Sequence, residues 1–505
     1  MKFNFIHLLL FFIFILAVII RFIYFPNNIY FSYDQARDSF ASLEILKGDL
    51  KIIGPSSSFN NNFFHGPLAY YVYAPIYFIS HNNPEAISIF LRIFNAAGIF
   101  LVFFIGTIIF SKKVGLLSAL FFAFSFEQSQ YSLFFGHPAF AVIPVLSFYL
   151  GLSLVFFKRN FKGLILALFS LGIAIQFHYV NSLLLIVLIV LLFIFRKEIK
   201  GVSFKYWLFS LVVFFFTIFS FILAEIKYNF RIISELLKSS KTLVTTTSFD
   251  FNHLGNIIRR LFQDNLGISD AFAPFIILIF ILMIILVLRN NIYHKKVFLL
   301  IIWFLGGLLP YFIFNSPTYY LNPAASVSLL ILGSFVIIYF LSKYKLIQMI
   351  LIIIIISLNL KLIFNFNSIG PNGDFVIQQG MLLSDEKKII DYVYLNSYGK
   401  PFSIKALSVP LSVNTTWSYL FEWYGKEKYS YLPMWTGPIA EGFPGNLEVI
   451  NVRSNLPSVQ FLIIEPTKGI REGYKENFMR EESYFTKIIN EVKIGNLIVQ
   501  KRQRI

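Results

Sequence analysis

Long apolar runs constrain this chain more than any other feature of its sequence. Residues 8–20 and 349–356 contain no charged side chain, and a helix that is apolar on every side needs lipid around it. Charged residues make up 14% of the chain, and the mean hydropathy is +0.70. A soluble domain has about 25% charged residues, so the sequence predicts a multi-pass α-helical membrane protein.

Composition excludes several classes of site. The chain has no cysteine, which rules out disulfides, iron–sulfur clusters, cysteine-ligated zinc and cysteine nucleophiles. It also lacks the sequence motifs of P-loops, HExxH metalloproteases and dinucleotide-binding folds. A net charge of +17 would suggest nucleic acid in a soluble protein. Here the positive charges lie in short clusters between apolar runs, where they report membrane topology, and we expect no nucleic-acid partner.

Charge and hydropathy divide the chain into two parts. Basic residues outnumber acidic ones more than two to one in residues 1–364, whereas the two are nearly balanced in residues 365–505. We therefore expect a transmembrane domain over 1–364, with a first outside loop at 26–86, and a small mixed α/β domain over 365–505. In that domain the pattern predicts helices at Asp385–Leu395 and Tyr474–Glu482, and strands at Val459–Ile464 and Ile494–Gln500.

About eleven transmembrane helices fit the apolar runs. The first follows the N-terminus as an uncleaved signal anchor, and the others lie near residues 87–110, 114–126, 138–157, 162–176, 180–195, 206–223, 271–288, 297–313, 322–341 and 347–364. Every second short loop is basic, which places those loops in the cytoplasm. The N-terminus is then inside and the C-terminal domain outside. Pro67–Ser80 is too short to span and rich in tyrosine, so we expect an interfacial segment.

The first outside loop opens with a charged helix. Ser32 and Gln35 form a capping-box pattern and Gly48 supplies a stop, so the pattern predicts a helix over about 33–47. Asp34, Arg37 and Asp38 stand at i, i+3 and i+4 and therefore share one face. Their spacing alone fits a solvated charge cluster as well as a site.

Acidic and histidine residues gather in the outside loops. His65 precedes a Gly-Pro pair, while Glu127 and His137 share the second loop and His178 lies in a third turn. An acid at the edge of an apolar helix is costly unless it is paired or functional. Because these residues all belong to outside loops, the predicted topology brings them to one mouth of the membrane domain.

The order of these motifs resembles the membrane glycosyltransferases of the GT-C superfamily, in particular its protein-mannosyltransferase-like and aminoarabinose-transferase-like branch. The resemblance covers residues 1–345. It depends on Tyr33–Asp38, Phe64–Tyr71, Arg92–Asn95, Gly115–Ser125 with Gln130–Ser132, Gln176–Tyr179 and Tyr319–Pro323. It implies a sugar donor linked to a polyprenyl phosphate and a glycan, lipid or protein acceptor, with transfer outside the plasma membrane and inversion at the anomeric carbon.

The resemblance also implies roles for individual residues. Asp34 matches the catalytic acid of the first loop and is the expected general base, with Glu127 as a second catalytic acid. Other relatives carry an acid where this chain has Phe64 and His137. The expected substrate-binding residues are Arg37, Asp38, His65, His137, His178, Arg259, Arg260 and Tyr320. No cofactor and no metal are expected, because side chains can stabilise a phosphate leaving group.

A transporter of a small polar solute or a lipid-linked sugar is the main alternative. Transporters of this size often contain internal repeats and charged or broken helices at the middle of the membrane. We find no repeat in the sequence, and the acidic residues lie at the outer edge of the apolar runs.

Overall fold

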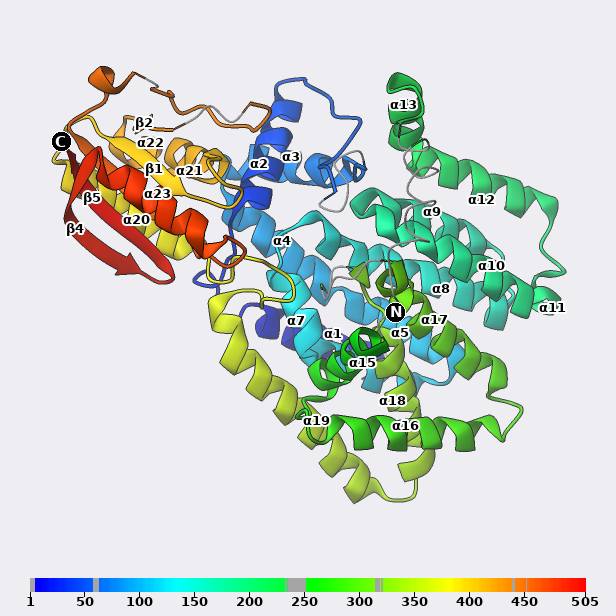
Figure 1. The fold of residues 1–505 in the computed structure, drawn as a ribbon. Helices are drawn as coiled ribbons and strands as arrows, with labels where there is room; N and C mark the ends of the chain where they lie inside the picture. Colours follow the sequence, from blue (N-terminus) through cyan, green and yellow to red (C-terminus); the bar gives the residue numbers. More distant parts are fainter. Residues whose placement is uncertain are drawn as a thin grey trace.

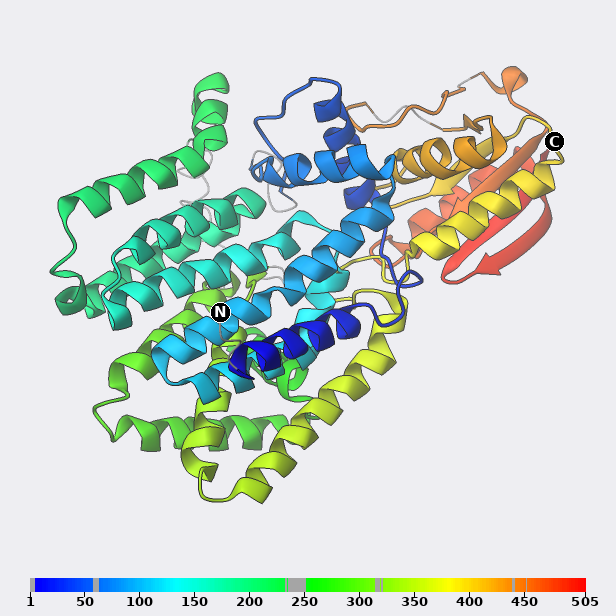
Figure 2. The same cartoon turned by 180° about the vertical axis from the view of Figure 1, so that it is seen from behind.

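The computed structural model describes residues 5–57, 63–231, 234, 251–313, 318, 321–437, 441–450 and 452–505. A large helical body forms the first part of the chain, and a small sheet with its helices lies at one end of this body (Figure 1). The view from behind shows α1 lying along the outside of the body (Figure 2). This arrangement is mostly helical with a small C-terminal sheet, as the sequence predicts.

Helices make up almost all of the body. They are α1 (Phe5–Arg21), α2 (Tyr33–Leu46), α3 (Leu68–Ser80), α4 (Pro84–Ala96), α5 (Gly98–Ile109), α6 (Lys112–Phe124), α7 (Phe126–Leu133), η1 (His137–Ala141), α8 (Val142–Lys158), α9 (Lys162–Phe177), η2 (Tyr179–Leu183), α10 (Leu184–Ile194), α11 (Arg196–Ile199), α12 (Phe204–Thr217), α13 (Phe219–Lys227), α15 (Phe251–Leu266), α16 (Ala273–Leu288), α17 (His294–Ile313), α18 (Val327–Leu341), α19 (Lys345–Phe366) and η4 (Asn367–Ile369).

Four of these helical segments are long and apolar enough to cross a membrane. They are Pro84–Ile109, His137–Lys158, His294–Phe312 and Lys345–Ile369, and the bent pair α12 and α13, at 57°, passes as one span. Among the described residues there are also six shorter apolar helices; five lie on other predicted runs, and the sixth is α3, the segment expected at the interface. The structure therefore supports a membrane body, while the number of eleven crossings stays a prediction.

Two buried arginines hold the first helices of the body together. Arg21, at the end of α1, donates to Asn95 Oδ1 (3.1 Å) and to the carbonyl of Phe122 (2.9 Å). Arg92 of α4 donates to Asn28 Oδ1 (2.9 Å) and to the carbonyl of Arg21. A buried charge is tolerated only with such partners, so the Arg92–Asn95 motif belongs to the packing of α1, α4 and α6.

Helix α2 begins and ends where the sequence predicts. The backbone N–H of Ser32 donates to Gln35 Oε1 (3.1 Å), as in a capping box, and Gly48 has a φ of +95° just after the helix. Its apolar face is covered by protein, since Phe40 packs edge-on against Tyr419 at 5.5 Å between ring centroids. Helix α2 therefore lies between α3 and the C-terminal part, which positions its acidic residues.

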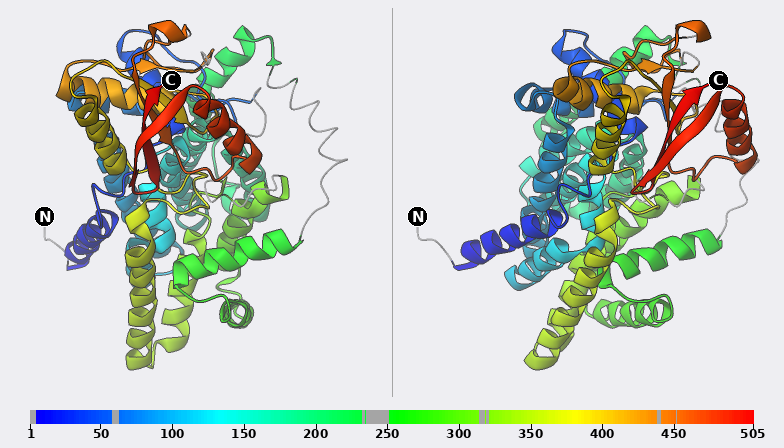
Figure 3. Two further views of the ribbon diagram at one scale, coloured as in Figure 1. Left: turned by 60° about the vertical axis from the view of Figure 1, so that its left-hand side comes forward. Right: turned by 90° about the vertical axis from the view of Figure 1, so that its left-hand side faces the viewer.

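The C-terminal part is a mixed sheet with helices. It contains α20 (Leu383–Ser397), β1 (Ser403–Leu407), α21 (Thr415–Leu420), η5 (Phe421–Gly425), α22 (Lys426–Tyr429), β2 (Met434–Trp435), η6 (Arg453–Asn455), β3 (Val459–Ile464), α23 (Glu472–Ser483), β4 (Thr486–Ile494) and β5 (Leu497–Arg504). The strand order is β2-β1-β3-β5-β4, with β2, β1 and β3 parallel and β4 and β5 antiparallel. Figure 3 shows this sheet near one end of α19, and α19 runs away from the sheet along the helical body.

Each of the four elements that local patterns predict in this part has a counterpart in the structure. The helices expected at Asp385–Leu395 and Tyr474–Glu482 are α20 and α23, and the strand expected at Val459–Ile464 is β3. The strand expected at Ile494–Gln500 corresponds to β5, which begins later, at Leu497, because Gly495 (φ +58°) and Asn496 form the turn of the β4–β5 hairpin. Two residues that accept left-handed conformations allow such a tight turn.

Candidate active site

The candidate site begins with a network on the exposed end of α2. Arg37 donates from one amino group to Asp34 Oδ1 (2.6 Å) and from the other to Asp38 Oδ1 (2.7 Å). The two acids differ in environment, because the side chain of Asp34 is 61% exposed and that of Asp38 is 2% exposed. The three residues therefore form one network with an accessible carboxylate at one end and a buried one at the other.

The buried end of this network reaches the segment between α7 and α8. Asp38 Oδ2 lies 3.6 Å from Nδ1 of His137, the first residue of η1. Burial alone would raise the pKa of Asp38, but the Arg37 guanidinium and His137 together lower it below its ordinary value. The side chain of Gln35 donates to the carbonyl of Phe135 and joins α2 to the same segment.

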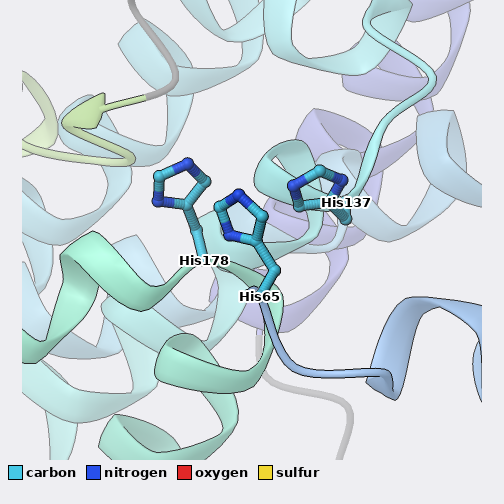
Figure 4. A group of neighbouring side chains, drawn as sticks. All are labelled: His65, His137 and His178. Carbon is cyan, nitrogen blue, oxygen red and sulfur yellow. The ribbon is translucent and has the colours of Figure 1, made fainter. Parts of the chain in front are cut away.

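Three histidines from separate segments meet beside this network (Figure 4). The ring of His65 lies between the other two, with its centroid 4.5 Å from that of His137 and 4.4 Å from that of His178. Burial and the neighbouring rings lower the pKa of His65 and of His178 well below the ordinary value. We call His65, His137 and His178 the histidine cluster; at neutral pH its two buried members, His65 and His178, are uncharged.

Backbone contacts fix the position of His65. Its N–H donates to the carbonyl of Pro55 (2.9 Å), and its carbonyl accepts from the N–H of Gly54 (2.8 Å). Gly66 then lies against the end of α9, where a Cβ would stand 2.6 Å from the carbonyl oxygen of Gln176 and 2.7 Å from its Cα. Only glycine permits this approach, which places His65 next to His178.

The sequence did not single out Tyr179 and Ser57 as members of this group. The ring of Tyr179 lies 5.0 Å from that of His65, and its hydroxyl is 3.0 Å from Ser57 Oγ. Tyr179 follows His178 directly in the sequence, so its position beside that histidine could have been predicted. Its contact with Ser57, 122 residues earlier in the chain, depends on tertiary packing and has no local signal.

Glu127 occupies a different, fully buried network. Its Oε2 accepts from Asn265 of α15 (2.7 Å), and Asn359 of α19 donates to the carbonyl of Asn265 (3.0 Å). Burial raises the pKa of the Glu127 carboxyl. Within the described part of the chain, no hydrogen bond or ion pair joins Glu127 to the α2 network or to the histidine cluster.

The two arginines of α15 also lie apart from the histidine cluster. Arg260 pairs with Asp374 at 3.2 Å, and Arg259 contacts Asp270 at 3.5 Å. Arg260 lies close enough to Glu127 to oppose the rise of its pKa. Tyr320 lies outside the described residues. The structure thus brings together Asp34, Arg37, Asp38, His65, His137 and His178 and leaves Glu127, Arg259 and Arg260 elsewhere.

The aromatic segment near the site has two parts. Trp417 is fully buried and its indole N–H donates to Glu465 Oε1 (3.0 Å), so this ring belongs to the core of the C-terminal part. Tyr419 and Trp423 instead line a cavity of about 340 Å³ between α2 and α21. An aromatic surface of this kind suits a sugar ring.

Comparison with known proteins supports the assignment of this fold. Residues 64–224 match the family model of dolichyl-phosphate-mannose-protein mannosyltransferases. No curated protein sequence matches the chain. Among solved structures, ArnT from Cupriavidus metallidurans, bound to undecaprenyl phosphate, is similar with a TM-score of 0.64 and 11% identity over 97% of both chains.

An archaeal enzyme shares the same architecture. The Archaeoglobus fulgidus oligosaccharyltransferase, tethered to an acceptor peptide, has a TM-score of 0.56 and 11% identity over 82% of this chain and 63% of its own. A second structure of it, AglB with an inhibitory peptide and dolichol phosphate, has a TM-score of 0.52 and 11% identity over 85% and 64%. The chain therefore shares the fold of ArnT and of this oligosaccharyltransferase, and its residues 64–224 are similar to the dolichyl-phosphate-mannose-protein mannosyltransferase family.

Proposed function

We propose that this protein transfers a sugar from a polyprenyl-phosphate carrier to an acceptor at the outer face of the plasma membrane. The observation that carries the proposal is the continuous group of Asp34, Arg37, Asp38 and the histidine cluster. An accessible carboxylate at one end and groups for a phosphate at the other are what such a transfer requires. Similar proteins bound to undecaprenyl phosphate and dolichol phosphate support the same donor class.

Asp34 is the general base in this proposal. Its carboxylate takes the proton of the acceptor group, the acceptor atom bonds to the anomeric carbon, and the bond from that carbon to the phosphate oxygen breaks. Attack from the face opposite the phosphate inverts the anomeric carbon. The 61% exposure of the Asp34 side chain leaves it accessible to an acceptor, and a positioned base contributes about 10²–10⁴-fold to the rate.

The departing polyprenyl phosphate needs hydrogen-bond donors and positive charge. His178 is the first candidate as a hydrogen-bond donor, because its ring lies within the histidine cluster. Arg37 is connected to the same cluster by Asp38, which pairs with Arg37 and lies 3.6 Å from His137. Arg259 and Arg260 are second candidates only, since both already pair with acids away from the cluster.

For Glu127 we propose a role in packing. A base must be accessible to the acceptor, but Glu127 is fully buried and its Oε2 accepts from Asn265. This bond joins α7 to α15, and Asn359 extends the connection to α19. The two-carboxylate scheme is therefore replaced by one base, Asp34.

We also propose the topology that this function needs. The N-terminus lies in the cytoplasm, while the first loop and residues 365–505 form an outside domain over the site. Tyr419 OH donates to the carbonyl of Asn82 (2.7 Å) and Lys387 pairs with Glu85, so this domain contacts the loop and helix after α3. The cavity lined by Tyr419 and Trp423 then lies on the acceptor side. A hexose or a pentose both fit this chemistry.

Native mass spectrometry with lipid extraction is the first experiment. The gently purified protein should carry a polyprenyl phosphate or its sugar adduct, and His178→Ala should lose it. A retained water-soluble solute with only bulk phospholipid would favour the transporter instead.

The extracted donor then supports a transfer assay in proteoliposomes. Asp34→Asn should abolish transfer while expression and lipid binding stay normal. Asp49→Asn is the matched control, since Asp49 is an exposed acid of the same loop at 64% side-chain exposure. Full transfer activity in both Asp34→Asn and His178→Ala would overturn the site assignment.

A further inference from the structure

The histidine cluster has the composition of a metal site. Three of the seven histidines of the chain come from the segment before α3, the start of η1 and the end of α9. The nitrogen that each offers lies within 4.8 Å of the other two. Figure 4 shows the three rings side by side with His65 in the middle. Three neutral imidazoles with an open fourth position are the ligand set of many catalytic zinc sites.

The distances require only a small closing movement. Bonds of about 2.0–2.1 Å from a tetrahedral ion place ligand nitrogens about 3.4 Å apart. The nitrogens of the cluster are within 4.8 Å, so each must move by about an ångström or less, which rotation of a side chain supplies.

His65 provides an independent indication of a ligand. Its side chain is 6% exposed, and its buried Nδ1 has no hydrogen-bond partner among the residues that the structure describes. An unpaired buried nitrogen is destabilising, and native proteins rarely contain one without a water, an ion or a function. A bound cation would fix this ring and offset that cost.

Asp38 supplies the outer support that metal-binding histidines usually have. A ligating histidine commonly donates its other ring N–H to a carboxylate, which orients the ring and raises its basicity. Asp38 Oδ2 lies 3.6 Å from His137 Nδ1, and Arg37 holds the other oxygen of the same carboxylate. The remaining nitrogen of His137, Nε2, is then the one available to a metal.

The net charge around the histidine cluster also favours a bound cation. Arg37 contributes one positive charge to the group, while Asp34 and Asp38 contribute two negative ones. Their net negative charge works against the positive charge that a phosphate needs nearby. A divalent cation on the histidine cluster would reverse the sign of this balance.

We propose that His65, His137 and His178 bind one divalent transition-metal ion of the zinc class, with Asp38 as the positioning carboxylate of His137. The open coordination position suits a phosphate oxygen of the lipid carrier, and this last clause alone depends on the proposed function. The metal site itself depends only on the geometry of the cluster.

Direct metal binding tests the site without any transfer assay. The full-length protein is purified in detergent through a tag without histidine, stripped with a chelator and titrated with Zn²⁺ against a chromophoric competitor. We expect one tightly bound ion per chain, and Co²⁺ in its place should show the visible absorption of a four-coordinate nitrogen site. Absence of a stoichiometric ion in the folded wild-type protein would overturn the proposal.

Variants assign the ion to the cluster. His65→Gln and His178→Ala should each weaken Zn²⁺ binding more than Asp38→Asn, which loses the roughly 10–100-fold expected of an outer partner. His81→Asn is the control, because His81 is an exposed histidine in a left-handed conformation (φ 52°) that asparagine accepts. Equal affinity in wild type, His65→Gln and His178→Ala would place the ion elsewhere and overturn the proposal.

Two readouts separate this proposal from the proposed function. Sugar transfer that persists in a protein shown to bind no metal would overturn the metal site and leave the transferase standing. Stoichiometric metal binding in a protein without transfer activity would support the metal site and remove the transferase.

Discussion

Asp38 lies 3.6 Å from His137 and joins two parts of the site that are 99 residues apart in the chain. Its Oδ1 accepts from Arg37 Nε (2.9 Å) and from an Arg37 amino group (2.7 Å), while Oδ2 faces His137 Nδ1. One oxygen of the buried carboxylate therefore contacts Arg37 of α2, and the other faces His137 at the start of η1. This division makes Asp38 the residue through which Asp34, the proposed general base, and the histidine cluster keep their relative positions.

Replacing Asp38 by asparagine should therefore destabilise the protein as well as stop transfer. Loss of one partner of a buried ion pair costs about 3 kcal/mol. The pKa of Asp38 is lowered in the fold, so its contribution is present above its unfolded value of about 3.9 and is lost as the pH falls through the folded value. Unfolding temperatures at pH 7 and pH 5 should both fall by several degrees, whereas Asp49→Asn should leave them unchanged. Equal unfolding temperatures for wild type and Asp38→Asn at pH 7 would contradict this.

Gly66→Ala should separate His65 from His178. The added Cβ would lie 2.6–2.7 Å from backbone atoms of Gln176, which cannot move like a flexible side chain. Overpacking of this kind costs about 1–3 kcal/mol. We expect a lower unfolding temperature and a loss of transfer and of Zn²⁺ binding.

Gly255→Ala is the matched control for that variant. Gly255 lies within helix α15, and a Cβ there would meet nothing within 4 Å. Alanine is the better helix former by about 1 kcal/mol, so this variant should be as stable as wild type or slightly more. Similar behaviour of the two alanine variants would argue against the close approach at Gly66.

The sequence predicts the elements whose signals are local. Ser32, Gln35 and Gly48 bound α2 within a residue of the expected range because capping and a left-handed glycine act over one turn. The strand expected at Ile494–Gln500 begins instead at Leu497, because the chain turns at Gly495 and Asn496 between two apolar stretches. Hydropathy describes the side chains, whereas the position of this turn depends on the backbone conformation of Gly495.

The candidate site likewise contains contacts that local spacing predicts and contacts that depend on tertiary packing. The spacing of Asp34, Arg37 and Asp38 predicts a shared face, and the ion pairs of Arg37 with both acids confirm that these residues meet. The contact of Asp38 with His137 could not be predicted, because it depends on how α2 packs against a loop far along the chain. The outside-loop pattern placed the histidines near one mouth but gave no distance between their rings.

Glu127→Gln distinguishes a packing role from catalysis. The amide oxygen of glutamine can still accept from Asn265, as Oε2 of Glu127 does at 2.7 Å. We expect transfer within a few-fold of wild type and an unfolding temperature at pH 8 that is unchanged or higher, since burial penalises the ionised form of Glu127. A loss of transfer as large as that of Asp34→Asn, in a protein that unfolds normally, would restore Glu127 to a catalytic role.

Glu386 in α20 should make the stability of the C-terminal part depend on pH. It is fully buried, neither of its carboxyl oxygens has a hydrogen-bond partner among the described residues, and burial raises its pKa well above 4.5. Above that unfolded value the unfolded chain loses a proton that the folded protein retains, so stability falls as the pH rises. Each unit of upward shift costs about 1.4 kcal/mol once the pH exceeds the folded pKa.

Glu386→Gln removes this ionisation while keeping the size of the side chain. The variant should match wild type in unfolding temperature at pH 5 and exceed it at pH 8, whereas Glu427→Gln, at an exposed position, should follow wild type at both. Thermal unfolding monitored by tryptophan fluorescence reports on this region, because Trp417 is buried there and donates to Glu465. A Glu386→Gln variant that is less stable than wild type at pH 8 would show that the carboxylate is ionised and paired in the fold, contrary to its enclosed position.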